Sequence, residues 1–221
     1  MTTRPRALIC AWPIVLVLAF AGCGSMQSSP DNPTGAGGLT PNVKDKDAGL
    51  IALAPGFDIN QYKVIVVEKF PVTDRIEDEG DRRFAAKMAN TLQLELVRRL
   101  RASGLFERVV NTSETEFKPG AEPALLLQGA ITRLGRGSQA ARAFAGLYGA
   151  GRARAQADMR FVEVGSDRVV MVTADRRISS YAPFTFGGSD EEHLEESFDD
   201  MARDLAKFLV RLSKGEAPRK D

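Results

Sequence analysis

Residues 63–110 read KVIVVEKFPVTDRIEDEGDRRFAAKMANTLQLELVRRLRASGLFERVV, and they contain the pattern of a strand, a long helix and a second strand. Lys63–Val67 is a short run rich in β-branched residues, which is typical of a strand buried on both faces. Apolar residues recur at every fourth position over Phe84–Leu100, and this spacing predicts an amphipathic helix of about 22 residues. Ser103-Gly104 is a typical helix end, and Leu105–Val110 predicts the next strand. The unit is therefore expected to be a βαβ crossover.

The rest of the chain adds three strands and a helix. Ala124–Leu134 is apolar enough for a strand, and Ala153–Phe161 alternates strictly between apolar and polar residues, which predicts one packed and one solvated face. Arg168–Ser179 is expected to pair back on it as a hairpin. A helix then follows over Leu194–Leu212, with Ser189 and Glu192 as a capping box. The order βαβ–β–ββ–α predicts an α+β fold, a mixed sheet of about five strands packed with two long helices.

The N-terminus has the layout of a secretory signal peptide. Arg4 and Arg6 precede an uncharged apolar run over residues 7–21, and small residues follow it. The alternative, a transmembrane anchor, is disfavoured because this run falls short of the ~20 residues that span a bilayer. The boundary FAGC, ending at Cys23, resembles the lipobox of bacterial lipoproteins, in which the cysteine is acylated.

An ordinary signal peptide with a cysteine at its boundary is the second interpretation of Cys23. The only other cysteine, Cys10, lies inside the signal, so Cys23 would remain an unpaired thiol in an oxidising compartment. Lipidation of Cys23 is therefore preferred, with the membrane as partner through the N-terminal lipid. Gly24 follows the cysteine, and by resemblance to enterobacterial sorting rules this favours the outer membrane, with the domain facing the periplasm.

Composition divides the chain into four parts. Residues 1–22 are the signal peptide, and 23–55 are expected to be the lipidated cysteine and a flexible linker, because Gly, Ser, Pro, Asn and Asp dominate there. Residues 56–213 are expected to form one α+β domain, and 214–221 a disordered tail. Without Arg4 and Arg6 the chain has 28 basic and 29 acidic residues, which argues against binding nucleic acid.

A glycine-rich run, GLYGAG at residues 146–151, first suggests a phosphate-binding loop. Its glycine order is the reverse of the dinucleotide-binding fingerprint, it leads into a strand, and it lacks the Gly-Lys-Ser/Thr of a P-loop. No cofactor is therefore expected. The simpler interpretation is a tight entry into a strand. The alternative is a subunit interface or a membrane-facing element, whose candidate residues are Arg142, Phe144, Gly146, Tyr148, Gly149 and Gly151.

Four other groups of residues are expected to be structural. The arginines around the glycine-rich run could meet lipid headgroups, anionic glycan or an acidic partner, but a solvated sheet face with dispersed charges is preferred; they are Arg133, Arg136, Arg142, Arg152, Arg154 and Arg160. The acidic residues near the start of the last helix lack calcium-loop spacing, and His193 lies among them without metal-binding companions. Phe184 and Phe186 are expected to close the edge of the core. No catalytic or metal-binding residue is assigned.

Several short motifs together resemble a family of bacterial lipoproteins, the domain-of-unknown-function 4410 type, over roughly residues 55–212. They are Tyr62-Lys63-Val64, Gly104-Leu105-Phe106, Leu127–Ile131, and the run of Arg142, Phe144, Gly146, Gly149 and Gly151. The hairpin turn departs from the family's Asp-x-x-Thr-Gly-like sequence, since it reads Val-Gly-Ser-Asp here. The resemblance implies no established activity, and the layout is also similar to periplasmic lipoprotein domains that build secretion channels or regulate envelope enzymes.

Three functions remain in order of preference. The first is a non-enzymatic, lipid-anchored periplasmic module that binds an envelope protein or associates with itself. The second is a ring-forming subunit of an outer-membrane secretion or pore complex, suggested by the small residues over 140–151. The third is an envelope enzyme that uses carboxylates for acid–base chemistry, although no pattern in the sequence pairs them.

Overall fold

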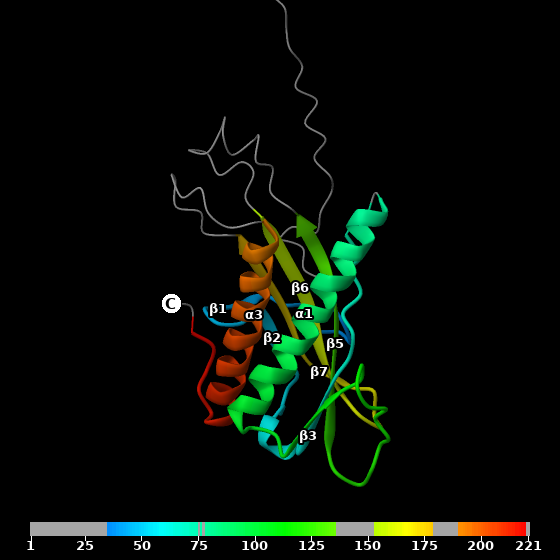
Figure 1. The fold of residues 1–221 in the computed structure, drawn as a ribbon. Coiled ribbons are helices and arrows are strands. Elements are labelled where there is room, and N and C mark those ends of the chain that lie inside the picture. Colours follow the sequence, from blue (N-terminus) through cyan, green and yellow to red (C-terminus); the bar gives the residue numbers. More distant parts are fainter. Residues whose placement is uncertain (1–34, 75, 77, 136–152, 179–189, 220–221) are drawn as a thin grey trace, which may run out of the picture.

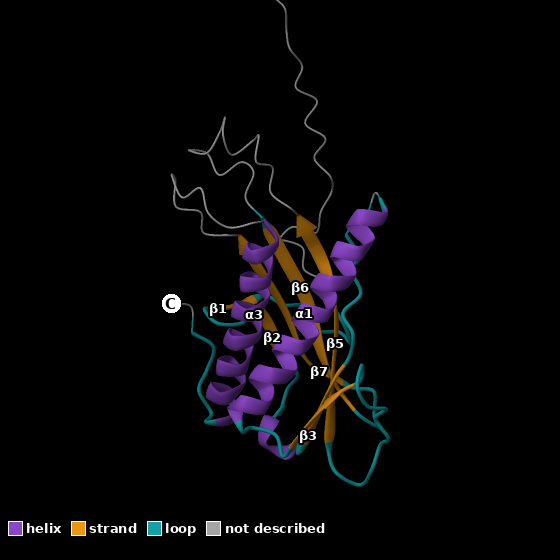
Figure 2. Cartoon of the chain, viewed as in Figure 1, coloured by secondary structure: helices purple, strands orange, loops and turns teal. Residues whose placement is uncertain are grey.

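The computed structural model describes residues 35–74, 76, 78–135, 153–178 and 190–219. Within them a seven-stranded sheet carries two long helices on one of its faces (Figure 1, Figure 2). The helices are α1 (Glu79–Ser103) and α3 (Asp190–Ser213), and a short 3₁₀ helix, η1, spans Ile59–Gln61. The strands are β1 (Val43–Asp45), β2 (Gly49–Leu53), β3 (Val64–Val67), β4 (Arg108–Asn111), β5 (Ala124–Gly135), β6 (Arg154–Glu163) and β7 (Val169–Ile178).

The predicted α+β class and mixed sheet are confirmed. The strand order is β1-β2-β7-β6-β5-β3-β4. β3 pairs in parallel with both β4 and β5, whereas all other pairs are antiparallel. Helix α1 connects β3 to β4, which makes the predicted βαβ unit, and all five predicted strands are present.

The expected flexible linker over 23–55 is wrong for its second half, because β1 and β2 belong to the sheet. β2 pairs with β7 along the sheet, and Ile51 at its centre is 1% exposed. The buried Asp45 of β1 also forms an ion pair with Arg211 of α3, with 2.8 Å between Arg211 Nη2 and Asp45 Oδ1. These strands are short and follow a glycine- and proline-rich segment. The composition of the region therefore predicts a linker, although tertiary contacts stabilise the two strands.

The tail beyond residue 213 also differs from expectation. The backbone N–H of Arg219 donates to Asp45 Oδ2 at 2.8 Å, and the N–H of Lys46 donates to the Arg219 carbonyl at 2.8 Å. The described part of the tail, up to residue 219, is thus paired with the β1–β2 hairpin.

Both ends of α1 have the groups that helix termini require. The side chain of Asp78 accepts a hydrogen bond from the Asp81 N–H at the start, and Gly104 ends the helix with a positive φ of 65°, as the Ser103-Gly104 pattern predicts. For α3, Gly215 takes a φ of 74° two residues after the last turn. The capping box at Ser189 lies outside the described residues.

The main core lies between the sheet and the two helices. α1 contributes residues at every fourth position, and α3 contributes Leu194, Phe198, Met201, Leu205 and Phe208, all buried. The two helices also pack on each other along much of their length (Figure 1). The predicted helical spacing is therefore the spacing of buried contacts.

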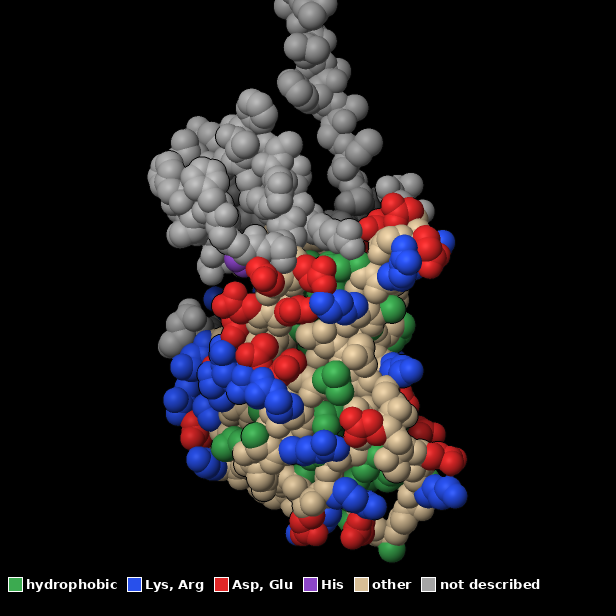
Figure 3. All heavy atoms as spheres, in the orientation of Figure 1, with side chains coloured by type: hydrophobic (Ala, Val, Ile, Leu, Met, Phe, Trp, Pro, Cys, Tyr) green, Lys and Arg blue, Asp and Glu red, His purple; other side chains and the backbone are tan. Residues whose placement is uncertain are grey.

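Several acidic residues of α3 form ion pairs with α1. Lys87 of α1 pairs with Glu191 and Glu195, and Arg99 pairs with Asp199 at 2.6 Å. Acidic side chains gather over the first half of α3 and basic ones over its second half (Figure 3), as the helix dipole favours. These charges therefore join the two helices.

The two faces of β6 have different environments. Ala155, Ala157 and Phe161 pack in the core beneath the helices. Their neighbours in sequence point to the opposite face, because side chains alternate along a strand. That face was predicted to be solvated, but Gln156 is 1% and Asp158 7% exposed, whereas Arg160 is exposed. The prediction holds for Arg160 and fails for Gln156 and Asp158.

Candidate functional site

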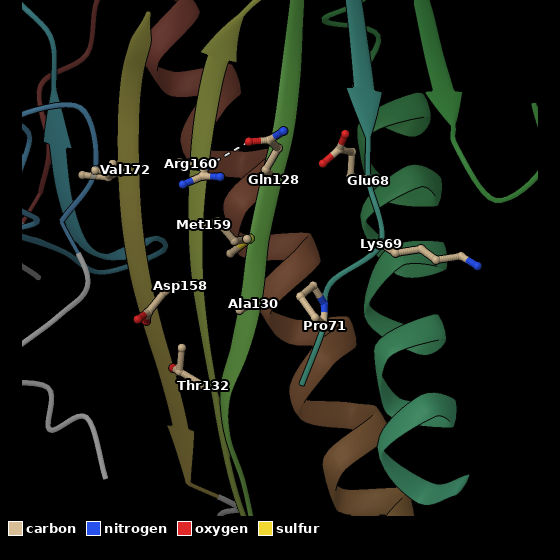
Figure 4. A pocket seen from close by; sticks show the side chains of 12 residues that line it. Glu68, Lys69, Pro71, Gln128, Ala130, Thr132, Asp158, Met159, Arg160 and Val172 are labelled. Carbon is tan, nitrogen blue, oxygen red and sulfur yellow. Dashed lines mark hydrogen bonds between the residues drawn. The ribbon is translucent and has the colours of Figure 1, made fainter. Parts of the chain in front are cut away.

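A groove of about 330 Å³ lies on the sheet face opposite the helices, which we call the helix-free face. Its polar lining comes from β5, β6 and the segment after β3, and includes Glu68, Gln128, Thr132, Asp158 and Arg160 (Figure 4). Arg160 Nε donates to Gln128 Oε1 at 3.0 Å. The groove therefore combines charged and amide groups on a rigid sheet.

The floor of the groove requires glycine at position 129. A Cβ added there would lie 2.2 Å from the Asp158 carbonyl oxygen and 2.8 Å from a ring carbon of Phe70. Neither neighbour has space to move, since one is backbone of β6 and the other a fully buried ring. The close approach of β5 and β6 at this point sets the shape of the groove.

The first described residues of the chain pack against this same face. Ala36 lines the groove together with Thr132 and Asp158. A Cβ on Gly37 would lie 2.6 Å from Val169 Cβ, so the backbone passes in close contact with β7. The described part of the chain thus begins on the helix-free face.

Beyond the groove, towards the ends of β5, β6 and β7, three arginines lie on the helix-free face: Arg133, Arg154 and Arg176. We call them the arginine group. Arg133 and Arg176 stand on either side of Gln156 in one cross-strand row, and Arg154 lies two residues from Gln156 on the same face. Three adjacent strands therefore bring together arginines that are far apart in the sequence.

Two irregularities in the sheet create this arrangement. In β5, Ile131 is opposite Ala157 while Arg133 is opposite Gln156, so Thr132 is an extra residue that turns Arg133 to the helix-free face. A second shift, beside Phe161, makes β7 skip one residue. Without it, the register would slip by one and Arg176 would point to the opposite face.

Among the described residues, no hydrogen bond or ion pair joins the arginine group to a carboxylate. The Nε atoms of Arg154 and Arg176 are buried and have no hydrogen-bond partner there. Burial and the neighbouring Arg176 and Arg154 guanidinium groups lower the pKa of Arg133, and Asp74 opposes this effect. The group is thus a concentration of positive charge, with Asp74 as the carboxylate that acts on Arg133.

Arg177, the next residue after Arg176 along β7, is paired with carboxylates, unlike the arginine group. It faces the helices, where its Nη2 lies 2.7 Å from Asp175 Oδ2 and its Nη1 lies 3.1 Å from Asp204 Oδ2 of α3. Burial alone would raise the pKa of Asp204, but Lys207 and Arg177 hold it below its usual value. Burial raises the pKa of Asp175 in spite of Arg177. This network fastens α3 to the sheet.

A third set of charges fastens the β6–β7 turn to η1. Glu163 accepts hydrogen bonds from the Tyr62 hydroxyl, from Arg168 Nε at 2.8 Å and from Ser166 Oγ at 2.8 Å. Arg168 and Tyr62 lower the pKa of Glu163 to about 2. Burial and the neighbouring Glu163 raise the pKa of Tyr62 to about 12. Both groups therefore keep one protonation state at neutral pH.

No cluster of three or more metal-ligating side chains occurs in the described part of the chain. His193 Nδ1 lies 4.0 Å from Glu196 Oε2, its neighbour one turn along α3. None of the helices in the described ranges is long and apolar enough to cross a membrane.

The predicted interface lies wholly outside the described residues, so its geometry stays a prediction; its residues are Arg142, Phe144, Gly146, Tyr148, Gly149 and Gly151. The predicted lipidation site Cys23 also lies outside them, as do Arg136, Arg152, Phe184 and Phe186. The structure does place the strand ends that flank residues 136–152, because Gly135 is opposite Arg154, which is opposite Ile178. Sequence reasoning missed Arg176, which joins the predicted Arg133 and Arg154 only through the register of β7.

Comparison with protein families matches residues 63–209 to the domain of unknown function DUF4410. The chain belongs to this family. The match confirms the resemblance seen in the sequence over nearly the same range. As its description says, the DUF4410 family has no assigned function. Comparison with curated proteins finds no match to this chain.

Solved structures similar to this DUF4410 protein share little sequence with it. A PelC dodecamer from Paraburkholderia phytofirmans is 14% identical, with a TM-score of 0.44, covering 72% of this chain and 97% of PelC. A DUF330 protein from Xanthomonas campestris is 12% identical, with a TM-score of 0.41 over 79% and 95% of the two chains. A candidate lipoprotein from Caulobacter crescentus CB15 is 14% identical, with a TM-score of 0.38 over 73% and 96%.

Proposed function

We propose that this DUF4410 protein is a lipid-anchored envelope protein whose folded domain binds a partner close to the membrane. The observation that carries the proposal is the position of Ala36, which already packs on the sheet thirteen residues after Cys23. Only residues 24–34 separate the cysteine from the first described residue, and they span at most ~40 Å when fully extended. A lipid on Cys23 would therefore hold the domain near the bilayer surface.

The proposed role is binding and not catalysis. Asp175, whose pKa burial raises, is covered by the protein and paired with Arg177. Three further carboxylates with shifted pKa values are held in structural ion pairs: Glu163 by Arg168, Asp204 by Lys207 and Asp45 by Arg211. Each of these three has a lowered pKa, so it stays ionised at neutral pH and is poorly suited to act as a general acid. An envelope enzyme remains the alternative function. A substrate found bound in the groove would favour it.

The proposed contact surface includes the predicted interface residues between β5 and β6. Residues 136–152 carry small and apolar side chains and three arginines, without any Asp or Glu. They connect Gly135 to Arg154 at the end of the sheet where the arginine group lies. A partner that is an envelope protein fits this composition, and the ring-forming assembly proposed from the small residues is the second candidate.

Replacement of the anchoring cysteine tests the location. We expect the Cys23→Ser variant to be released from the membrane fraction into the soluble periplasmic fraction, because it cannot be acylated. Ser25→Ala, a change of similar size two residues later, should leave the protein in the membrane fraction. Fractionation and mass spectrometry of the N-terminal peptide measure both results. A Cys23→Ser protein that stays in the membrane fraction, or an unmodified Cys23 thiol in the parent, contradicts the anchor.

Crosslinking in intact cells tests the binding role. A photo-crosslinking residue in place of Phe144 or Tyr148 should capture one discrete envelope protein. The control is the same residue in place of Leu94, which is 43% exposed on α1 and outside the proposed surface. Adducts between copies of this chain would support the ring-forming alternative instead. Equal capture from all three positions, or no adduct from Phe144 and Tyr148, contradicts a contact surface in this segment.

A further inference from the structure

Within the described residues, no ion pair with a carboxylate neutralises the arginine group, although the buried Asp158 lies on the same face and accepts a hydrogen bond from Gln156. Residues 123–157, which contain Arg133 and Arg154, include no Asp or Glu, and neither do residues 176–189, which begin with Arg176. The segments that leave the sheet at this end therefore supply no counter-charge and bring three more arginines. Asp74 is the described carboxylate that acts on Arg133, and its Oδ2 also accepts the Leu134 N–H at 2.7 Å.

Half-buried arginines on the helix side of the sheet form ion pairs with carboxylates. Arg177 and Arg211 each contact two carboxylates at 3.1 Å or less. The buried Nε atoms of Arg154 and Arg176 have no partner in the described chain. A buried donor without a partner destabilises the folded chain, so a ligand that accepts these hydrogen bonds would recover that free energy.

We propose that Arg133, Arg154 and Arg176 form a binding site for a phosphate group, supplied by the headgroup of an anionic membrane lipid. Guanidinium groups bind phosphate oxygens through paired, charge-assisted hydrogen bonds. The Cα atoms of Arg133 and Arg176 lie about 10 Å apart, two strand spacings across the sheet. Their side chains can therefore converge on one compact anion.

The membrane as the source of the phosphate follows from where the chain enters the fold. Ala36 lines the same groove as Thr132, the residue next to Arg133. The segment that leads back to Cys23 therefore joins the domain on the face that carries the arginine group. This part of the inference rests on the proposed lipid anchor, whereas the phosphate chemistry of the site does not.

Binding measurements on unlipidated protein test the site without the anchor. The mature chain, residues 23–221 with Cys23→Ser, is titrated with inorganic phosphate and pyrophosphate by calorimetry. It is also sedimented with phosphatidylcholine vesicles that contain or lack phosphatidylglycerol. We expect both anions to bind, and the protein to sediment with the vesicles that contain phosphatidylglycerol. Arg154→Gln and Arg176→Gln should each weaken phosphate binding about tenfold, because one charge-assisted contact is lost.

Arg160→Gln is the matched control, since it removes the same charge from the same face of β6 at a residue that is exposed and bonded to Gln128. It should change phosphate affinity less than about twofold if the effect is local. Thermal unfolding without phosphate checks that the variants fold. Arg154→Gln and Arg176→Gln should be at least as stable as the parent there, because they relieve repulsion.

Three results would overturn parts of the inference. Equal weakening by Arg160→Gln, or no binding of phosphate and vesicles, overturns the site. Polyglutamate that binds as tightly as pyrophosphate, through Arg154 and Arg176, assigns the surface to an acidic protein and overturns the phosphate ligand. Phosphate binding without sedimentation on vesicles supports the site and overturns the lipid as its source. None of these results depends on the Cys23 fractionation, so the two proposals fail separately.

Discussion

Glu163 shows how a single residue stabilises the junction between distant segments. Its carboxylate accepts hydrogen bonds from Tyr62, a hundred positions earlier, and from Ser166 and Arg168 in the adjacent turn. These donors favour the ionised form, which lowers the pKa of Glu163 from 4.5 to about 2. The unfolded chain binds a proton at higher pH than the folded one, so the stabilisation depends on pH.

The sign of that dependence gives a prediction. A lowered pKa contributes stability above about 4.5 that is lost as the pH falls towards about 2. Glu163→Gln should lower the free energy of unfolding by about 2 kcal/mol near pH 7, and by much less near pH 3. Denaturant unfolding at both pH values measures the difference. Glu107→Gln removes an exposed ion pair with Lys63 and should have little effect at either pH; a pH-independent loss for Glu163→Gln contradicts the assignment.

At the scale of elements, the β1–β2 hairpin extends the sheet on the N-terminal side of the predicted strands. β2 extends the sheet beside β7, and the Thr173 hydroxyl donates to the Ala48 carbonyl between β1 and β2 at 2.5 Å. Arg211 of α3 pairs with Asp45 and Asp47 in the same hairpin. The hairpin therefore connects the edge of the sheet to the last helix.

Truncation of the buried residue of this hairpin tests its contribution. Ile51→Ala should lower the free energy of unfolding by about 3 kcal/mol, because it leaves a cavity in the core. Val43→Ala, in the partner strand, should cost less than about 0.5 kcal/mol, since Val43 is 42% exposed. Chemical denaturation measures both. Equal and small effects would restore the interpretation of residues 43–53 as a linker.

For the whole molecule, the division between the two faces of the sheet matters most. α1 and α3 cover one face (Figure 1), where ion pairs such as Arg99–Asp199 join the two helices and Arg177–Asp204 joins helix to sheet. The opposite face carries the groove, the entry of the chain at Ala36 and the arginine group. The helices thus cover one face of the sheet, and the phosphate site that we propose lies on the other.

The sequence predicted much of this architecture, since its signals are local. Apolar spacing located α1 and α3, and β-branched and alternating runs located five strands. Short motifs also identified the family. Hydrophobic periodicity is sufficient for these elements because each buries one side against a common core.

The hairpin and the arginine group could not be predicted in this way. β1 and β2 are stabilised by pairing with β7 and by Arg211, contacts made across more than a hundred residues. The face on which Arg133 and Arg176 lie depends on two single-residue irregularities in the sheet. A shift of one residue reverses the face of every side chain that follows in a strand, and packing of the whole sheet selects that shift. Local sequence patterns thus determine the types of the elements. The proximity of the three arginines is determined only by the tertiary structure of the sheet.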